Sequence, residues 1–404
     1  MSSFIARQPI LNADKKTFGY EVLYRDSNKN EFPEENPEEA SLKVLVDLFT
    51  NYGITYIGKG LPIFINTPLY TLKKSLPPFP KESIFFEINQ TEINNNFDLS
   101  FIKELHYSSF NLSYQGSDLP HQSILRFFNA IKIDFSIAPK EKRSLLPKYI
   151  PQNKVLIAHK IENNLLYEEA LEEGYKLFQG FYFSKPETLT KKNFTASQIE
   201  ILNIIKMLLS ENLKWDRIEK EIKKNAYLTI KILKLVNSSF FGFRCEVKSV
   251  LQAIVLLGRK QMIKWLIMIL LTEKTTAPLE LLKITLTRAR LMQLLAQETS
   301  KKFKEDEYYL IGLLSLFDVI TGFSKENLLI HLPLSETISN AIKGVDNPQT
   351  RSYLQALKLV ELYEKGDWEK VISMCYELRI RHERMGNLYM EAISWADETL
   401  ESIA

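Results

Sequence analysis

The sequence predicts an α/β domain followed by an all-α domain. Short β-type apolar runs alternate with helical segments over about the first 190 residues, and long stretches with helical periodicity fill the remainder. Strands separated by helices need crossover connections, which favour a largely parallel sheet closed into a (β/α) barrel. With 404 residues, 45% of them hydrophobic, the chain has enough apolar material for two separate cores.

Apolar runs mark the strands predicted for the barrel, which are Ile63–Ile65, Ile84–Ile88, Ile131–Asp134, Val155–Ala158 and Phe178–Phe183. The clearest helix between them is predicted to begin at Asn36, an N-cap residue followed by Pro37, and to end near Gly53. Because the carboxyl ends of parallel barrel strands converge on one mouth, polar residues that end these runs are expected to lie close together.

The polar residues at these strand ends form the candidate site: Asn66, Glu87, Asp134, His159, Glu162 and Gln179, with Glu21 and Arg25 near the N-terminus. Carboxylate and amide oxygens are the ligands that Mg²⁺ and Mn²⁺ prefer, so a mouth lined in this way favours a divalent cation. Any one of these residues alone is more simply explained as a polar strand end that bonds to backbone or loop groups. The prediction therefore depends on the whole set.

The second half of the chain contains only patterns with helical spacing. The predicted helices are Ile199–Leu209, Trp215–Lys224, Leu228–Val236, Val250–Leu257, Gln261–Leu271, Leu281–Glu298, Glu307–Ile320, Ser335–Ile342, Thr350–Lys365, Trp368–Leu378 and Asn387–Trp395. The segment Ser184–Thr190, which contains Pro186, is the natural boundary. We therefore expect domains at residues 1–190 and 195–404.

Several short motifs occur in order through the first domain: Glu21-Val-Leu23, Phe64-Ile-Asn66, Phe86-Glu-Ile-Asn89, Ile131-Lys-Ile-Asp134 and Gln179-Gly-Phe-Tyr-Phe-Ser-Lys-Pro186. Together they resemble the EAL family of cyclic di-GMP phosphodiesterases over nearly all of residues 1–190. The resemblance implies an EAL-type barrel whose metal ligands are Glu21, Asn66, Glu87 and Asp134. It also implies that Lys132 orients the attacking water and that Arg25 and Gln179 contact the dinucleotide.

The chain departs from the EAL pattern where the family places adjacent Asp residues that bridge two metals. With the motif's glycine at Gly116, Ser113 and Tyr114 stand in place of those carboxylates. Asp118 lies two positions beyond the glycine and is a poor substitute. Two divalent cations about 3.5–4 Å apart need bridging carboxylates to offset their charge. We therefore expect the family's two-metal site to be absent.

A second departure affects the family's Ala-Glu-Gly-Val-Glu motif. Here the first Glu is replaced by His159 and the Gly by Lys160, while Glu162 keeps the last position. Lys132, His159 and Glu162 are thus interpreted as vestigial catalytic residues, and the metal ligands as vestigial too. No cofactor is expected beyond a single Mg²⁺ held weakly at the mouth. Lys160 supplies a cation that attracts phosphate.

The helical half contains two further motifs, Leu233-Lys-Leu-Val-Asn-Ser-Ser-Phe-Phe-Gly242 and Val250-Leu-Gln-Ala-Ile-Val-Leu-Leu-Gly258. They resemble the HDOD domain, a degenerate, HD-like relative of the metal-dependent HD phosphohydrolases. An HD enzyme needs a His-Asp pair, and none of the five histidines in this chain is followed by Asp. The resemblance thus implies an interaction domain without HD metal ligands.

Both resemblances together predict a bacterial, non-catalytic signal-transduction protein with a degenerate EAL phosphodiesterase domain, which binds protein partners through the HDOD domain. The alternatives are a receptor that binds cyclic di-GMP without cleaving it, through Arg25, Gln179 and Lys160, and a residually active phosphodiesterase. Cyclic di-GMP is expected to bind weakly, and a homodimer is compatible with the sequence. The formal charge of +3 argues against nucleic acid as a partner.

The chain is expected to be cytoplasmic. Two cysteines, Cys245 and Cys375, are too few for a disulfide scaffold and are interpreted as buried, reduced thiols. The N-terminal residues do not have the pattern of a signal peptide. The longest apolar run, Trp265–Leu271, is far shorter than the roughly 20 residues that a membrane span needs.

Overall fold

The computed structural model describes residues 3–26, 57–73, 83–95, 99–119, 122–184, 194–238, 241, 246–273, 275 and 277–403. The chain divides into two compact units. The first consists of Met1–Lys185 together with Leu362–Val371 and His382–Gly386, and the second of Pro186–Glu361, Ile372–Arg381 and Asn387–Ala404. The predicted helix from Asn36 to Gly53 lies outside the described residues, as does Cys245.

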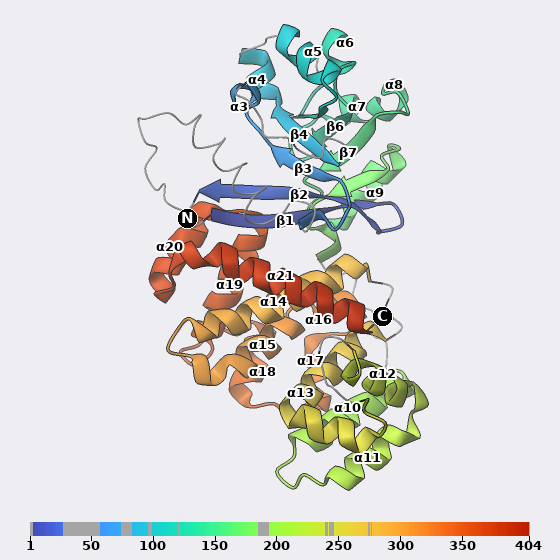
Figure 1. Ribbon diagram of the computed structural model, residues 1–404, viewed down its shortest axis with the longest axis vertical. Helices are drawn as coiled ribbons and strands as arrows, with labels where there is room; N and C mark the ends of the chain where they lie inside the picture. The colour runs from blue at the N-terminus through green and yellow to red at the C-terminus, as the bar shows by residue number, and fades with distance from the viewer. Residues whose placement is uncertain are drawn as a thin grey trace. The chain divides into compact units, whose positions relative to one another are not determined.

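The first unit contains a closed barrel of eight strands that follow one another in chain order (Figure 1). They are β1 (Ser3–Asn12), β2 (Thr17–Asp26), β3 (Ile63–Asn66), β4 (Ile84–Asn89), β5 (Asn111–Gly116), β6 (Ala130–Asp134), β7 (Val155–His159) and β8 (Leu177–Gln179). β1 runs antiparallel to both of its neighbours, β2 and β8, and all other neighbouring strands are parallel. The predicted fold class, a largely parallel barrel before a helical region, is confirmed.

Short helices connect the parallel strands, and they are α3 (Leu69–Lys73), α4 (Gln90–Asn95), α5 (Leu99–Tyr107), α6 (Gln122–Leu125), α7 (Lys140–Arg143), α8 (Leu146–Tyr149) and α9 (Asn164–Glu172). The sequence analysis did not predict β1, β2 or β5. The predicted strand Phe178–Phe183 is wrong at its end, because β8 stops at Gln179 and a 3₁₀ turn (Tyr182–Ser184) follows.

An apolar layer fills part of the barrel interior, formed by Ile10, Phe64, Phe85, Ala130 and Ile157. The Phe64 and Phe85 rings stack with their centroids 4.6 Å apart. Since alternate residues of a strand share a face, the residue two places further along β4, β6 or β7 also points inward, toward the carboxyl end of the barrel. The residues at those places are Glu87, Lys132 and His159.

The second unit is built from helices. They are α10 (Ala196–Leu209), α11 (Trp215–Lys224), α12 (Ala226–Val236), α13 (Val250–Thr272), α14 (Leu279–Gln297), α15 (Glu305–Leu314), α16 (Phe317–Thr321), α17 (Lys325–His331), α18 (Glu336–Lys343), α19 (Arg351–Lys365), α20 (Trp368–Leu378) and α21 (Met385–Ile403). Three of them, α19, α20 and α21, share residues with the first unit. The two helices predicted over 250–271 correspond to two helical stretches of α13, which meet at a kink where Gly258 has a non-helical backbone (φ +69°, ψ 174°). The single helix predicted over 307–320 is wrong, because α15 and α16 are separate.

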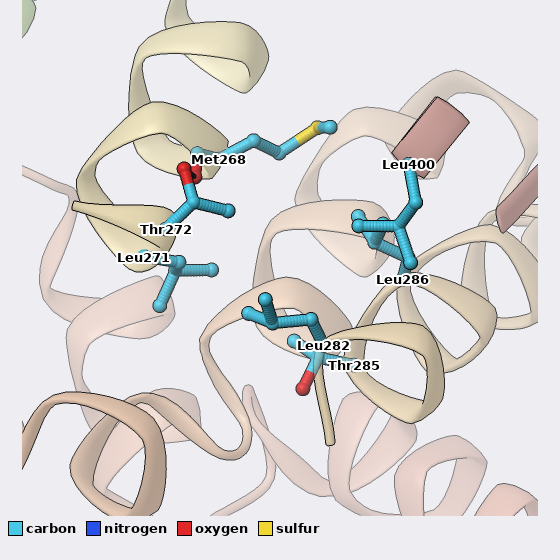
Figure 2. A pocket seen from close by; sticks show the side chains of 7 residues that line it. All are labelled: Met268, Leu271, Thr272, Leu282, Thr285, Leu286 and Leu400. Carbon is cyan, nitrogen blue, oxygen red and sulfur yellow. Dashed lines mark hydrogen bonds between the residues drawn. The ribbon is translucent and has the colours of Figure 1, made fainter. Parts of the chain in front are cut away.

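The described parts of the second unit contain two small cavities. Leucine, methionine and threonine side chains from α13, α14 and α21 surround the first (Figure 2), whose volume of about 10 Å³ is about the size of one water molecule. The second has about 100 Å³ and is lined by Lys264 and Arg290 among aromatic rings. Lys264 pairs with Asp306 and Arg290 with Glu391, so both cations are already neutralised.

Cys375 is buried and forms no disulfide with another described residue. Among the described helices, none combines the length and the apolar character that crossing a membrane requires.

Candidate functional site

The side chain of Lys132 lies at the centre of a buried polar cluster inside the barrel. Its Nζ atom is 2.9 Å from Glu21 Oε2 on β2 and 2.5 Å from Glu87 Oε1 on β4. It also lies 5.5 Å from the centroid of the Phe64 ring, in the apolar layer. Lys132 and Glu87 are completely buried and Glu21 is 4% exposed. The ammonium group is therefore held by two carboxyl groups and an aromatic face away from water.

The two carboxyl groups differ in protonation at neutral pH. Burial raises the pKa of Glu87 to about 8, an effect that the Lys132 ammonium only partly offsets. Burial also acts to raise the pKa of Glu21, but Lys132 and the hydrogen bond from Gln179 outweigh it and lower the pKa to about 2. Despite burial, the two carboxyl groups raise the pKa of Lys132. The ionised pair is therefore Glu21 with Lys132, beside a neutral Glu87.

Amide side chains join Glu21 to His159 and to β1. Gln179 donates a hydrogen bond to Glu21 Oε2, and a second one, 3.3 Å long, to Gln8 Oε1. Gln115 Nε2 lies 3.3 Å from His159 Nδ1. The other ring nitrogen of His159, Nε2, is 4.0 Å from Glu21 Oε2. Burial, with the nearby Lys132 charge, lowers the pKa of His159 to about 4. The imidazole is thus neutral and the cluster has no net charge at pH 7.

Asp134 and Lys160 form a separate pair at the carboxyl ends of β6 and β7. Lys160 Nζ is 2.7 Å from Asp134 Oδ2, and Ser136 donates hydrogen bonds to Asp134 Oδ1 from its backbone amide and its hydroxyl. Burial acts to raise the pKa of Asp134, but the bonds from Lys160 and Ser136 lower it overall. The Lys160 charge is therefore already partnered.

Three other predicted residues lie outside the buried cluster. Arg25 is half-buried on β2, at the end beyond Glu21, and makes no ion pair with another described residue. Asn66 is exposed at the end of β3, and Glu162 is exposed in the connection after β7. The structure brings together Glu21, Glu87 and Lys132 with His159 and Gln179. Asn66 adjoins this cluster, because it pairs with Glu87 in the β3–β4 ladder, but its side chain is exposed. Among the described residues, Arg25 and Glu162 form no hydrogen bond or ion pair with the cluster.

The positions that depart from the EAL pattern are occupied by side chains with other roles. Ser113 is fully buried beside Glu87 in the β4–β5 ladder, and Tyr114 is buried with its hydroxyl donating to the Asp118 backbone carbonyl at 2.7 Å. The Asp118 carboxylate pairs with Lys142. Among the residues that the structure describes, no carboxylate therefore replaces the missing bridge.

The donor set does not fit a two-metal centre. A carboxylate must be deprotonated to bind a metal, and of the two buried carboxyl groups only Glu21 is ionised at neutral pH, where Lys132 already neutralises it. Within the part of the chain that the structure describes, no three acidic, histidine or cysteine side chains are grouped so that they could hold a metal ion.

Sequence reasoning missed Gln8 and Gln115, which bond to the cluster from β1 and β5. Gln8 lies opposite Glu21 in the β1–β2 ladder, and paired residues of antiparallel strands point to the same side. The signal that could have identified it is the β1–β2 hairpin itself.

The protonation of Glu87 makes a prediction for the pH dependence of stability. The pKa of Glu87 is near 8 in the folded state, against an ordinary value of 4.5, so at neutral pH the folded protein holds a proton that the unfolded chain has released. The stability that this proton contributes is therefore lost as the pH rises toward 8. His159 acts in the opposite direction, but only below pH 6.5. From pH 6.5 to 8 the free energy of unfolding should fall by up to about 2 kcal/mol.

Urea titrations at pH 6.5, 7.2 and 8.0 measure this decline. The Glu87→Gln variant, which cannot ionise, should show a flat profile over the same range. The exposed Glu162→Gln variant is the control and should keep the decline of the wild type. Equal slopes in the wild type and Glu87→Gln would contradict the assignment of the proton to Glu87.

The HDOD domain family model matches residues 199–319, from α10 into α16. The chain therefore has a closed α/β barrel in its N-terminal part, followed by a helical region with an HDOD domain. Two curated bacterial proteins match it almost end to end. YuxH of Bacillus subtilis is 28% identical over 418 residues, covering 100% of both chains. CdgJ of Vibrio cholerae, named a cyclic di-GMP phosphodiesterase, is 27% identical and covers 98% of this chain and 93% of its own.

Two solved structures match about half of the chain. BlrP1 of Klebsiella pneumoniae, in a complex with manganese and cyclic di-GMP, is 19% identical with a TM-score of 0.38, covering 45% of this chain and 55% of its own. YkuI of Bacillus subtilis, described with an EAL domain and in complex with cyclic di-GMP and calcium, is 18% identical with a TM-score of 0.35. That match covers 56% of this chain and 72% of YkuI.

Proposed function

We propose that this chain is a non-catalytic signal-transduction protein of the cyclic di-GMP type that acts by binding protein partners. The observation that carries the proposal is the position of Lys132, whose ammonium group lies between Glu21 and Glu87. A metal pair that activates water would need both carboxylates ionised and bridging ligands beside them. Here one is neutral, the other is paired, and Ser113 and Tyr114 occupy the bridging positions.

Partner binding is assigned to the HDOD domain. Its helices α12 and α13 contact each other and leave apolar side chains in solvent, including Ile230, which is 55% exposed, and Val255, which is 67% exposed. A contiguous apolar patch is typical of surfaces that bind other proteins, and we take these side chains to belong to one. A homodimer through such a surface belongs to the same proposal. The place of action is the cytoplasm.

Cyclic di-GMP would bind weakly under this proposal. Arg25 can donate two hydrogen bonds to a phosphate, and each good charged bond contributes about 1.5–3 kcal/mol. Lys160 adds little because Asp134 already neutralises it. One such contact gives a dissociation constant in the millimolar to high-micromolar range. A single Mg²⁺ at Glu21, Asn66 and Glu87 would have to compete with Lys132 and would also bind weakly.

A residually active phosphodiesterase is the second candidate, because CdgJ, which matches nearly the whole chain, is named a cyclic di-GMP phosphodiesterase. The full chain, incubated with cyclic di-GMP and Mg²⁺ or Mn²⁺, should release no linear dinucleotide above background, as read by chromatography. The matched variant is Glu21→Gln, which keeps the size of the side chain but removes its charge. Metal-dependent product that disappears in Glu21→Gln would overturn the non-catalytic assignment.

A further inference from the structure

The barrel unit includes a segment from far along the chain, Leu362–Val371, which we term the cover segment. It comprises the end of α19, a turn at Gly366 and the start of α20. Two hydrogen bonds fix it to β1: the Ile5 backbone amide donates to the Tyr363 hydroxyl at 3.1 Å, and Gln8 Nε2 donates to the Glu364 carbonyl at 3.2 Å. Gln8 is the same side chain that accepts a bond from Gln179.

Aromatic packing adds to these bonds. Phe4 is completely buried, with its ring stacked on Trp368 at a centroid distance of 5.4 Å and against the edge of Tyr363 at 6.1 Å. The two rings of the cover segment also pack edge to face at 5.1 Å. An aromatic pair contributes beyond the area it buries, so this cluster is a specific attachment of the segment to β1.

The register of the β1–β2 ladder places the cover segment on the mouth side of the cluster. Phe4 pairs with Arg25, and Gln8 pairs with Glu21. Paired residues share a face and alternate residues repeat it, so Arg25 and Leu23 lie on the same face as Glu21, further along β2. A Cβ atom on Gly366 would be 2.6 Å from Leu23 Cδ1, so the turn presses directly on this face.

Lys365, next to Gly366 in the same turn, reaches the connection that follows β8. Lys365 Nζ lies 5.7 Å from the ring centroid of Phe181, two residues after Gln179. The segment therefore spans from β1 and β2, where Arg25 lies, to the connection after β8. These are the two places from which a dinucleotide at the mouth would be contacted.

We propose that the cover segment is an intramolecular occupant of the barrel mouth, and that it and a cyclic dinucleotide exclude each other. A ligand that reached Arg25 and Gln179 together would need the space now held by Tyr363–Gly366. Apparent affinity falls in proportion to the fraction of molecules in which the segment is released. The inference rests on the proposed function only in taking cyclic di-GMP as the ligand.

The test uses the full chain with a substitution that pushes the turn away. Gly366 has φ +71° and its missing Cβ faces Leu23, so Gly366→Val introduces backbone strain and a branched side chain that must displace the end of Leu23. Gly344→Val is the matched control, because Gly344 has φ +79° but open space around it. A gentler variant, Tyr363→Phe, removes only the hydroxyl that accepts the Ile5 amide.

Two measurements are made on each variant: hydrogen exchange of peptides within Ser3–Asn12, and calorimetric titration with cyclic di-GMP. We expect Gly366→Val to speed exchange in β1 and to tighten the dissociation constant, each at least tenfold, while Gly344→Val behaves as the wild type. Tyr363→Phe should speed exchange at Ile5.

Unchanged exchange in both cover-segment variants would refute the attachment of the segment. Faster exchange without tighter binding would refute the exclusion of nucleotide. Linear dinucleotide produced by the wild type, assayed separately, would instead refute the non-catalytic function, so the two failures are distinguishable.

Discussion

The Lys132→Met variant is expected to lower the free energy of unfolding of the barrel by about 3–5 kcal/mol at pH 7. Methionine fills a similar volume, so the loss arises from charge. Glu21, whose pKa is about 2 beside Lys132, would be left as a buried carboxylate without a counter-ion. Breaking one side of a buried ion pair is costly because the remaining charge has lost its hydration and has no partner.

Urea unfolding followed by circular dichroism measures the effect. Lys160→Met is the control: it removes an ion pair of similar length, 2.7 Å, but its side chain is 49% exposed, so water screens it and the loss should stay within about 1 kcal/mol. Adding Glu21→Gln to Lys132→Met should restore part of the stability, since it removes the stranded charge. Equal losses from the two lysine variants would contradict the structural role assigned to Lys132.

The Gly180→Ala variant is expected to destabilise the barrel by at least about 2 kcal/mol, as conformational strain and overlap add together. Gly180 has φ +151°, and an added Cβ would lie 2.1 Å from the Ile161 carbonyl oxygen. The Ile161 amide donates to the Gln179 carbonyl and its carbonyl accepts from the Tyr182 amide, both at 3.0 Å, so the backbone there cannot move aside without breaking these bonds.

Gly60→Ala separates the two effects. Gly60 also has a positive φ, +78°, but nothing lies within 4 Å of the added atom, so only the strain of about 1–2 kcal/mol remains. Thermal unfolding of both variants compares them directly. A Gly180→Ala protein no less stable than Gly60→Ala would show that the close approach to Ile161 is unimportant.

Many helices of the second unit were predictable because their apolar residues recur with helical spacing. The predicted bounds of α11 and α20, Trp215–Lys224 and Trp368–Leu378, agree with the structure, and in α11 the buried residues are Ile218 and Ile222, one turn apart. α17 was missed because it is short, and only Leu328 is buried in it.

The strands that were missed carry part of the site. β1, β2 and β5 place Gln8, Glu21 and Ser113 in the barrel interior, where a strand pattern predicts apolar residues. Because their inward-facing residues are polar, these strands lack the alternating apolar pattern by which strands are predicted. The motif resemblance nevertheless identified Glu21. The resemblance also named Lys132, but its contacts with Glu21 and Glu87 depend on barrel closure, which local patterns do not contain.

The antiparallel position of β1 between β2 and β8 has a consequence for the order in which the chain folds. The β1–β2 hairpin is synthesised first. The other edge of β1, where Ile10 pairs with Gln179, can form its ladder only after the whole barrel segment has emerged. Pairings between residues far apart in sequence form slowly, and an unpaired edge recruits strands from other chains. Nascent or truncated chains that end before Leu177 would therefore expose β1 as an aggregation-prone edge, and arrival of β8 covers that edge only at Ile10–Asn12.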